Sequence, residues 1–146
     1  MDELLIKEAT ISQPLPHSVE AEQAVLGGLM LKNEAFESIS DVLVEKDLYN
    51  KNHQLIFSAM VTLADNGQPF DPITLSENLQ SKNHLATIGG AEYLVELTEN
   101  TPSAANIKAY SQIVIERSIV RQLILAASET IQKGFNPLGW DSSKLL

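Results

Sequence analysis

The sequence has 146 residues, of which 44% are hydrophobic and 20% charged, a composition typical of a folded, water-soluble chain. Its 19 acidic and 10 basic residues give a formal net charge of −9, which disfavours direct binding to DNA or to an anionic membrane surface. The absence of cysteine excludes disulfides, thiolate nucleophiles and cysteine-ligated metals, and is consistent with the cytoplasm. No apolar run approaches the roughly 20 residues that a membrane helix needs, and the acidic N-terminus is not that of a signal peptide.

The first two thirds of the chain are predicted to form short helices. Residues 1–13 precede two prolines and are predicted to be a flexible arm. Ser18 is predicted to cap a helix that begins at residue 19 and carries apolar residues at helical spacing. Gly27 and Gly28 lie inside this helix at a cost of about 1 kcal/mol each. We therefore expect another helix to approach closely at this point.

Further start and stop signals follow along the chain. Asn33 is predicted to cap the next helix, and Asn66-Gly67 is predicted to end the one after it. Asp71-Pro72 has the pattern of a helix start, and Gly89-Gly90 separates two further helical segments. No segment alternates between apolar and polar residues in the manner of a strand. Residues 14–100 are thus predicted to form a compact head of several helices.

The last third of the chain is predicted to contain one long helix. Residues 104–133 contain neither Gly nor Pro, which allows a helix of about 45 Å that ends at Gly134. Asp141 or Ser142 is predicted to cap another helix, and the chain ends in its first turn. We therefore expect residues 101–146 to form a long helix and the start of a truncated second one, and the sequence to be a piece of a longer protein.

The long helix carries two apolar stripes, and Arg117 interrupts the seven-residue spacing of the first one. The first stripe consists of Tyr110, Ile113, Val120, Ile124, Ala127 and Ile131, and the second of Ile115, Ile119, Leu123 and Ala126. A small head cannot cover both stripes, so at least one is expected to face a partner helix. The alternative is that both are buried within a single monomeric bundle.

The sequence predicts no catalytic, cofactor or metal site. It has no phosphate-binding loop motif, and its glycine pairs match no dinucleotide-binding pattern. The three histidines lack the spacing of metal ligands and are interpreted as surface or packing residues. Asp41 and Glu45, one helical turn apart, are interpreted as a solvated helix face, and a small hydrolase is therefore disfavoured. Arg117 and Arg121 share one helix face, from which they could pair with acidic groups across an interface or touch a phosphate.

Four segments resemble one family in their order and spacing. They are PHSVEAEQAVLGGLML at residues 16–31, DPITL at 71–75, IGGAEYLVEL at 88–97 and NTPSAANIKAYSQIVIERSIVRQLI at 100–124. The family is the N-terminal domain of the bacterial replicative DNA helicase of the DnaB type, and the resemblance covers about residues 14–139. It implies an all-α fold, with a helical head followed by the first arm of a helical hairpin whose second arm is truncated here.

The resemblance also implies a function in DNA replication. Copies of the domain are expected to pair and to close as a trimer of dimers, forming a collar on a hexameric helicase. The collar is expected to bind the C-terminal region of primase and, as a further partner, a helicase loader. ATP, Mg²⁺ and most DNA contacts are expected to belong to a C-terminal RecA-like motor that is absent from this chain. The alternative is a stand-alone helical regulator or loader-like protein that lacks a motor.

Two sets of residues are predicted to carry these interactions. Self-association is assigned to residues of the first stripe of the long helix: Tyr110, Ile113, Arg117, Val120, Ile124 and Ile131. The primase-facing surface is assigned to positions that match the family, namely Glu20, Tyr93 and Ile124. The alternative for Tyr93 and Ile124 is packing within the head or hairpin.

Overall fold

All regular structure in the computed structural model is helical over the residues that it describes, 13–136. The elements are α2 (Val19–Leu31), a 3₁₀ turn η1 (Asn33–Ala35), α3 (Phe36–Ser40), a second 3₁₀ turn η2 (Glu45–Asp47), α4 (Lys51–Asp65), α5 (Pro72–Ser81), α6 (Leu85–Ile88), α7 (Gly90–Glu99) and α8 (Ile107–Phe135). This confirms the predicted all-α fold class. Most of the predicted arm, residues 1–12, and the predicted cap at Asp141 or Ser142 lie outside the described residues.

Local capping groups explain where several of these helices begin and end. The Ser18 hydroxyl accepts a hydrogen bond from the amide of Ala21 at the start of α2. The Asp71 carboxylate accepts from two amides of the first turn of α5, which begins with Pro72. Gly67, just after α4, has a φ of 67°, a left-handed conformation that suits glycine. These three boundaries were predicted from the sequence and are confirmed.

Asn33 does not act as the predicted helix cap. Its amide nitrogen donates to the carbonyl oxygens of Leu29 and Phe70, and its amide oxygen accepts from the amide of Phe70. Asn33 therefore ties the end of α2 to the loop that precedes α5. An asparagine that bonds to distant backbone and one that caps its own helix look the same in the sequence.

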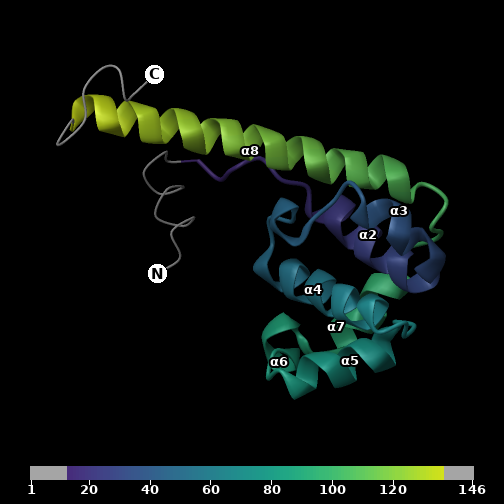
Figure 1. The fold of residues 1–146 in the computed structure, drawn as a ribbon. Coiled ribbons are helices and arrows are strands. Elements are labelled where there is room, and N and C mark those ends of the chain that lie inside the picture. Colours follow the sequence, from purple (N-terminus) through teal and green to yellow (C-terminus); the bar gives the residue numbers. More distant parts are fainter. Residues whose placement is uncertain (1–12, 137–146) are drawn as a thin grey trace.

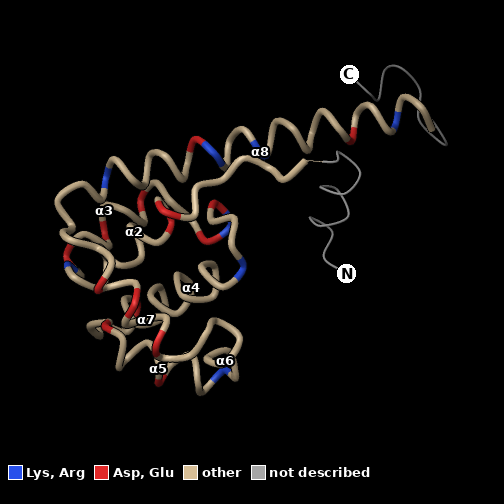
Figure 2. The backbone as a smooth tube through the Cα atoms, turned by 180° about the vertical axis from the view of Figure 1, so that it is seen from behind, with Lys and Arg blue, Asp and Glu red and all other residues tan. Residues whose placement is uncertain are grey.

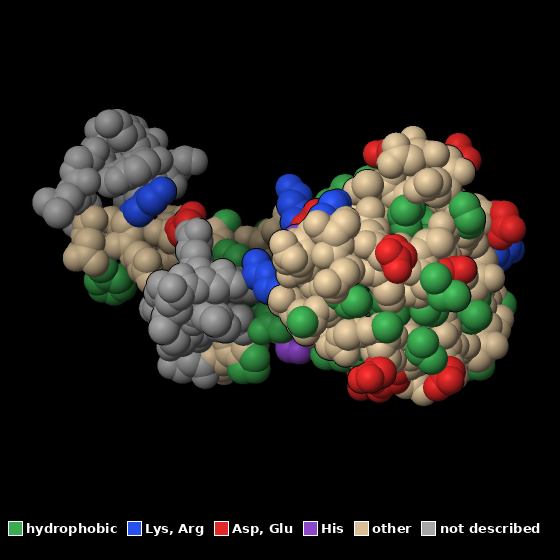
Figure 3. Space-filling view, turned by 90° about the horizontal axis from the view of Figure 1, so that it is seen from below, with side chains coloured by type: hydrophobic (Ala, Val, Ile, Leu, Met, Phe, Trp, Pro, Cys, Tyr) green, Lys and Arg blue, Asp and Glu red, His purple; other side chains and the backbone are tan. Residues whose placement is uncertain are grey.

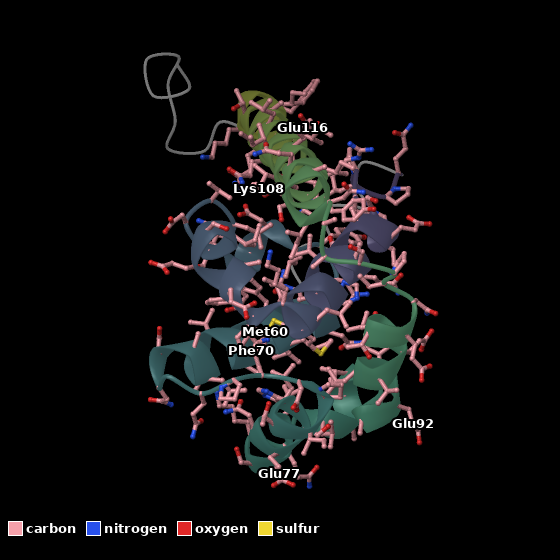
Figure 4. The ribbon with its side chains drawn as sticks, turned by 90° about the vertical axis from the view of Figure 1, so that its right-hand side faces the viewer. Met60, Phe70, Glu77, Glu92, Lys108 and Glu116 are labelled. Carbon is pink, nitrogen blue, oxygen red and sulfur yellow. The ribbon has the colours of Figure 1, made fainter. Side chains whose placement is uncertain are left out.

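The helices α2 to α7 surround one hydrophobic core. Helix α2 packs against α7 and α4 on one side and α8 on the other, and α5 packs against α4 and α7. Met60 of α4 and Phe70 lie inside this group of helices, whereas Glu77 and Glu92 point outward (Figure 4). The predicted limits of the head, residues 14–100, agree with this arrangement but remain a prediction.

Gly27 marks a close approach between α2 and the end of α7. A Cβ atom at this position would lie 2.1 Å from Oγ1 of Thr101 and 2.4 Å from the carbonyl oxygen of Leu97. At Gly28 the nearest atom would be Cδ1 of Ile107, at 3.1 Å. The close approach predicted from the glycine pair is thus confirmed, and it is much tighter at Gly27.

Helix α8 crosses the head and then continues well past it (Figure 1). It extends to Phe135, so Gly134 lies within the helix and the predicted end at Gly134 is wrong. Among the described residues, none has an atom within 4 Å of a Cβ atom built at Gly134, so no packing within this part of the chain depends on the glycine. A single glycine near a helix end lowers helix propensity by only about 1 kcal/mol, which a 29-residue helix tolerates.

Candidate functional site: the exposed flanks of α8 and the surface of α2 and α7

The face of α8 that packs on the head is neither of the two predicted stripes. Its buried residues recur at spacings of four and three: Ile107, Ser111, Val114, Ser118 and Arg121. At 100° per residue this face lies roughly 120° from each predicted stripe. Two of its members are serines, whose small side chains let α8 lie close to the head. Because the two serines and Arg121 are polar, this face has no continuous hydrophobic pattern in the sequence.

Arg121 is the last buried residue of α8 and binds the head itself. Its two terminal nitrogens donate to the carbonyl oxygens of Pro16 and Asp47, at 2.9 and 2.7 Å. Its guanidinium carbon lies 5.4 Å from the centre of the Tyr49 ring, and Tyr49 stacks on His17. The predicted role of Arg121 at an interface or on a phosphate is therefore wrong, because these intramolecular contacts bury it.

Beyond Arg121, α8 exposes apolar residues of both predicted stripes. None of residues 122–136 is buried. Leu123 of the second stripe is 65% exposed, and Ile131 of the first stripe is 59% exposed. Charged residues are sparse on this protruding part of the helix (Figure 2), and hydrophobic side chains are visible on the stretches of it that Figure 3 leaves uncovered. The alternative in which one monomer buries both stripes does not hold for this structure.

The predicted self-association residues fall into two groups. Tyr110 and Ile113 are partly buried against the head core, and Arg117 and Ile124 are also partly buried. Val120 and Ile131 are exposed. Only the part of the first stripe from Val120 onward is therefore largely available to a partner.

A shallow groove separates the first turns of α2 from the end of α7 and the start of α8. Its volume is about 290 Å³, and its lining includes Glu20 and Gln23 from α2, Glu96 from α7 and Tyr110 from α8. Two carboxylates at a largely apolar groove favour a cationic side chain with an aliphatic stem. The structure thus brings Glu20, a predicted primase-facing residue, beside Tyr110.

Tyr93, the second predicted primase-facing residue, takes part in a chain of hydrogen bonds across the head. Its hydroxyl oxygen lies 2.5 Å from Nε2 of His53 in α4 and accepts from Nε2 of Gln23 in α2 at 3.3 Å. Nδ1 of His53 lies 2.8 Å from Oε1 of Glu22. Tyr93 is partly exposed, whereas His53 and Glu22 are buried. These hydrogen bonds therefore link a residue at the surface to the interior of the head.

Backbone amides hold Glu22, at the buried end of this series of hydrogen bonds, in place. Its carboxylate accepts hydrogen bonds from the backbone amides of Tyr49 and Asn50, at 2.7 and 3.3 Å, in addition to the bond from His53. Burial of an ionised carboxylate is tolerated when hydrogen bonds replace its lost hydration. The start of α4 and the adjoining loop supply these donors.

The surroundings of Tyr93 change the acidity of its hydroxyl. Burial raises the pKa of the Tyr93 phenol above its ordinary value of 10.0, and the nearby charges of Glu96 and Glu22 raise it further. The hydrogen bond from Gln23 lowers this pKa and partly offsets the rise. Tyr93 therefore remains a neutral hydrogen-bonding group at physiological pH.

Sequence reasoning missed the pairing of Glu22 with His53, although a signal was present. Glu22 stands three and four residues before Val25 and Leu26, which point into the core. His53 has the same spacing to Ile56 and Phe57 in α4. A charged residue and a histidine on two apolar helix faces indicate a buried pair, because each needs a polar partner there.

The remaining predicted residue, Ile124, lies three residues past Arg121, on the part of α8 that carries no buried residue. The predicted primase-facing set therefore spans both the head and α8. Asp41 and Glu45 are both exposed, as predicted, but they do not share a helix, so the predicted solvated helix face is wrong in this respect.

Two further findings concern residues 13–136. No group of three or more His, Asp or Glu side chains in this part of the chain is arranged to hold a metal ion. No helix in it is both long enough and apolar enough to span a bilayer.

Comparison with known proteins gives consistent results at the level of sequence. The model of the family described as "DnaB-like helicase N terminal domain" matches residues 14–116. Replicative DNA helicase DnaB of Buchnera aphidicola subsp. Baizongia pistaciae is 51% identical over 132 residues, 90% of this chain and 28% of that protein. DnaB of Haemophilus influenzae is 44% identical over 140 residues, 96% of this chain and 30% of that protein. The chain thus spans less than a third of the length of these relatives.

Solved structures agree with the sequence comparison. The N-terminal domain of DnaB helicase from Mycobacterium tuberculosis superimposes with a TM-score of 0.87 at 34% identity, over 90% of this chain and 92% of that one. A DnaB-like replicative helicase whose structure was described together with its interactions with primase gives a TM-score of 0.67 at 28% identity, over 77% of this chain and 26% of that one. On these grounds, the chain belongs to the family of DnaB-like helicase N-terminal domains.

Proposed function

We propose that this chain is the collar domain of a replicative DNA helicase, which pairs subunits and binds primase during DNA replication. The observation that carries the proposal is the protruding half of α8, which exposes two apolar flanks. An exposed Leu or Ile forgoes about 1.5–3 kcal/mol of burial free energy. Family membership adds that the matched relatives are replicative helicases.

The proposed pairing surface is the exposed part of α8, and a second copy of this chain is the proposed partner. Between residues 122 and 135 the only charged residues are Glu129 and Lys133, so little like-charge repulsion opposes pairing in spite of the net charge of −9. Apolar residues repeating every three to four positions suit a helix that packs along another helix. Closure of such pairs into a trimer of dimers, and hence a hexamer, belongs to this proposal.

Light scattering on the purified chain tests the pairing. The wild type is expected to be a dimer or a larger oligomer. Ile131→Asp and Leu123→Asp test the two flanks one at a time, because each variant places a charge on one flank only. Ile73→Asp is the matched control, since Ile73 is 75% exposed but lies on α5. A wild type that is monomeric at high concentration, or oligomers that survive both α8 variants, would contradict the proposal.

The proposed docking surface for the C-terminal region of primase includes Glu20, Tyr93 and Ile124. Support comes from the groove beside Glu20 and from the partly exposed ring of Tyr93 on the same side of the head as Gln23. The test is isothermal titration calorimetry with the primase C-terminal region from the same organism. Tyr93→Ala is expected to weaken binding, whereas Ile73→Ala on α5 is expected to leave it unchanged.

The remaining parts of the proposal concern the whole helicase. ATP and Mg²⁺ are assigned to a C-terminal motor, together with most of the DNA contacts, and a helicase loader is a further proposed partner in the cytoplasm. This chain is accordingly expected to show no ATP hydrolysis and weak DNA binding at physiological salt. Tight, salt-resistant DNA binding by the chain would contradict this division of roles.

A further inference from the structure

The hydrogen-bond partners of His53 fix which of its ring nitrogens carries the proton. A carboxylate can only accept, so Nδ1 of His53 must be the protonated nitrogen that donates to Glu22. When the ring is neutral, Nε2 therefore has a free lone pair. The two backbone amides that bind Glu22 hold its carboxylate in place and so hold this tautomer.

This tautomer determines the state of the Tyr93 hydroxyl. With the His53 ring neutral, the hydroxyl donates its one proton to Nε2 and accepts from Gln23. Its ring is nearly parallel to the imidazole, with 7° between the planes and 5.9 Å between the centres. Tyr93 is therefore held from α2 and α4 at the same time, although it stands on α7 and is partly exposed. A side chain that is immobilised before binding loses less conformational freedom when a partner arrives.

The surroundings of Tyr93 indicate the chemistry of the partner group. Helices α2 and α7 contain no Lys or Arg, whereas Glu20, Glu92 and Glu96 are exposed on them. Glu92 points away from the head (Figure 4). A partly exposed aromatic ring, on a surface where α2 and α7 carry exposed carboxylates and no basic residue, favours a lysine or arginine side chain, through cation–π attraction and charge complementarity.

We infer that Glu22 and His53 are positioning residues, which hold Tyr93 ready to receive a cationic side chain of the primase C-terminal region. The inference rests on the docking function proposed above and adds a mechanism to it. Neither Glu22 nor His53 touches the partner, because both are buried. They act by fixing the ring and hydroxyl of Tyr93.

A pair of substitutions at His53 tests the positioning role by calorimetry with the primase C-terminal region and the whole chain. The amide of Asn reaches the place of Nδ1 only, so His53→Asn keeps a partner for Glu22 and releases Tyr93. The amide of Gln reaches the place of Nε2, so His53→Gln is expected to recover much of the binding that His53→Asn loses. Tyr93→Ala and His53→Asn are each expected to weaken binding about tenfold, as substitutions at binding hot spots do. The double variant is expected to bind no more weakly than Tyr93→Ala, because the two residues act as one unit.

A control variant separates positioning from general stability. Leu79→Ala removes a buried side chain of α5 that has no part in the chain of hydrogen bonds. It is expected to lower the free energy of unfolding without a comparable loss of binding. Equal binding losses in Leu79→Ala and His53→Asn would overturn the positioning role.

Nitrogen-15 NMR of the His53 ring gives a readout that does not depend on primase. The wild type is expected to show a protonated Nδ1 at neutral pH. Glu22→Gln is expected to reverse the tautomer, because its amide nitrogen can donate to Nδ1. A protonated Nε2 in the wild type would overturn the inference whatever the binding data show.

The outcomes also distinguish the two proposals. If Tyr93→Ala leaves binding unchanged, the proposed docking surface is wrong at Tyr93 and the positioning role fails with it. If Tyr93→Ala weakens binding but His53→Asn does not, the docking surface stands and only the positioning role is overturned.

Discussion

Substitution of Gly27 by alanine tests the close contact between α2 and the end of α7. The new Cβ atom would lie 2.1 Å from Oγ1 of Thr101 and 2.4 Å from the carbonyl oxygen of Leu97. The Thr101 hydroxyl cannot simply rotate away, because it donates a buried hydrogen bond to that same carbonyl at 2.8 Å. The second atom belongs to the backbone of α7. The methyl group is therefore accommodated only if α2 and α7 move apart.

The magnitude follows from two opposing effects. Overpacking a core costs about 1–3 kcal/mol, and backbone displacement places this substitution at the upper end. Alanine gains about 1 kcal/mol over glycine from helix propensity. We expect Gly27→Ala to lower the free energy of unfolding by about 2 kcal/mol.

Two other glycines provide matched controls for the same substitution. At Gly28 the nearest atom is the tip of the Ile107 side chain, at 3.1 Å, which can shift slightly. At Gly134 a Cβ atom would meet no described residue within 4 Å, so Gly134→Ala is expected to stabilise the chain by about 0.5 kcal/mol, from helix propensity near a helix end. Gly28→Ala is expected to fall between the other two variants.

Urea unfolding followed by far-ultraviolet circular dichroism measures all three variants under one condition. The expected order of stability is Gly134→Ala, then Gly28→Ala, then Gly27→Ala. A Gly27→Ala variant as stable as the wild type, or less damaging than Gly28→Ala, would refute the packing argument.

Three further predictions concern polar contacts and pH. Arg121→Met removes the charged donor to Pro16 and Asp47 and is expected to lower the unfolding free energy in urea by about 3 kcal/mol; a loss below about 1 kcal/mol would contradict this. Asp71→Ala removes the cap of α5 and is expected to cost about 1 kcal/mol in the same assay, whereas no change would show that solvent caps the helix equally well. The raised pKa of the Tyr93 phenol means that the folded state keeps this proton to higher pH than the unfolded state. Its contribution to stability is therefore complete below pH 10.0 and declines as pH rises through the folded value. The free energy of unfolding from urea curves is expected to fall less steeply with rising alkaline pH for Tyr93→Phe than for the wild type. Equal slopes for the two proteins would contradict the raised pKa of Tyr93.

Signals that act within a few residues allowed correct predictions of helix starts and ends. Ser18, Asp71 and Gly67 each satisfy or permit a backbone geometry next to them in the chain, so their effect can be predicted without the tertiary structure. Gly134 is the exception, because one glycine lowers helix propensity by only about 1 kcal/mol and α8 continues to Phe135.

The candidate site was predicted only in part. The apolar flanks of α8 have the periodicity of a helix and could be predicted, because a small head leaves them uncovered. The head-facing side of α8 was not predicted, since Ser111, Ser118 and Arg121 give no hydrophobic signal. The contacts of Arg121 depend on carbonyl groups about 75 to 105 residues away, and no local pattern specifies these.

By itself the sequence determined the all-helical class, a close helix approach at Gly27 and Gly28, and a long helix with two apolar stripes that the head cannot fully cover. Each of these follows from spacing along one segment of chain. The tertiary structure decided that a third face of α8, outside both stripes, meets the head. It also decided that Asn33 binds Phe70 and that hydrogen bonds join Glu22, His53 and Tyr93. These hydrogen bonds join residues 31 to 40 positions apart, and their directionality requires the helices to be already placed.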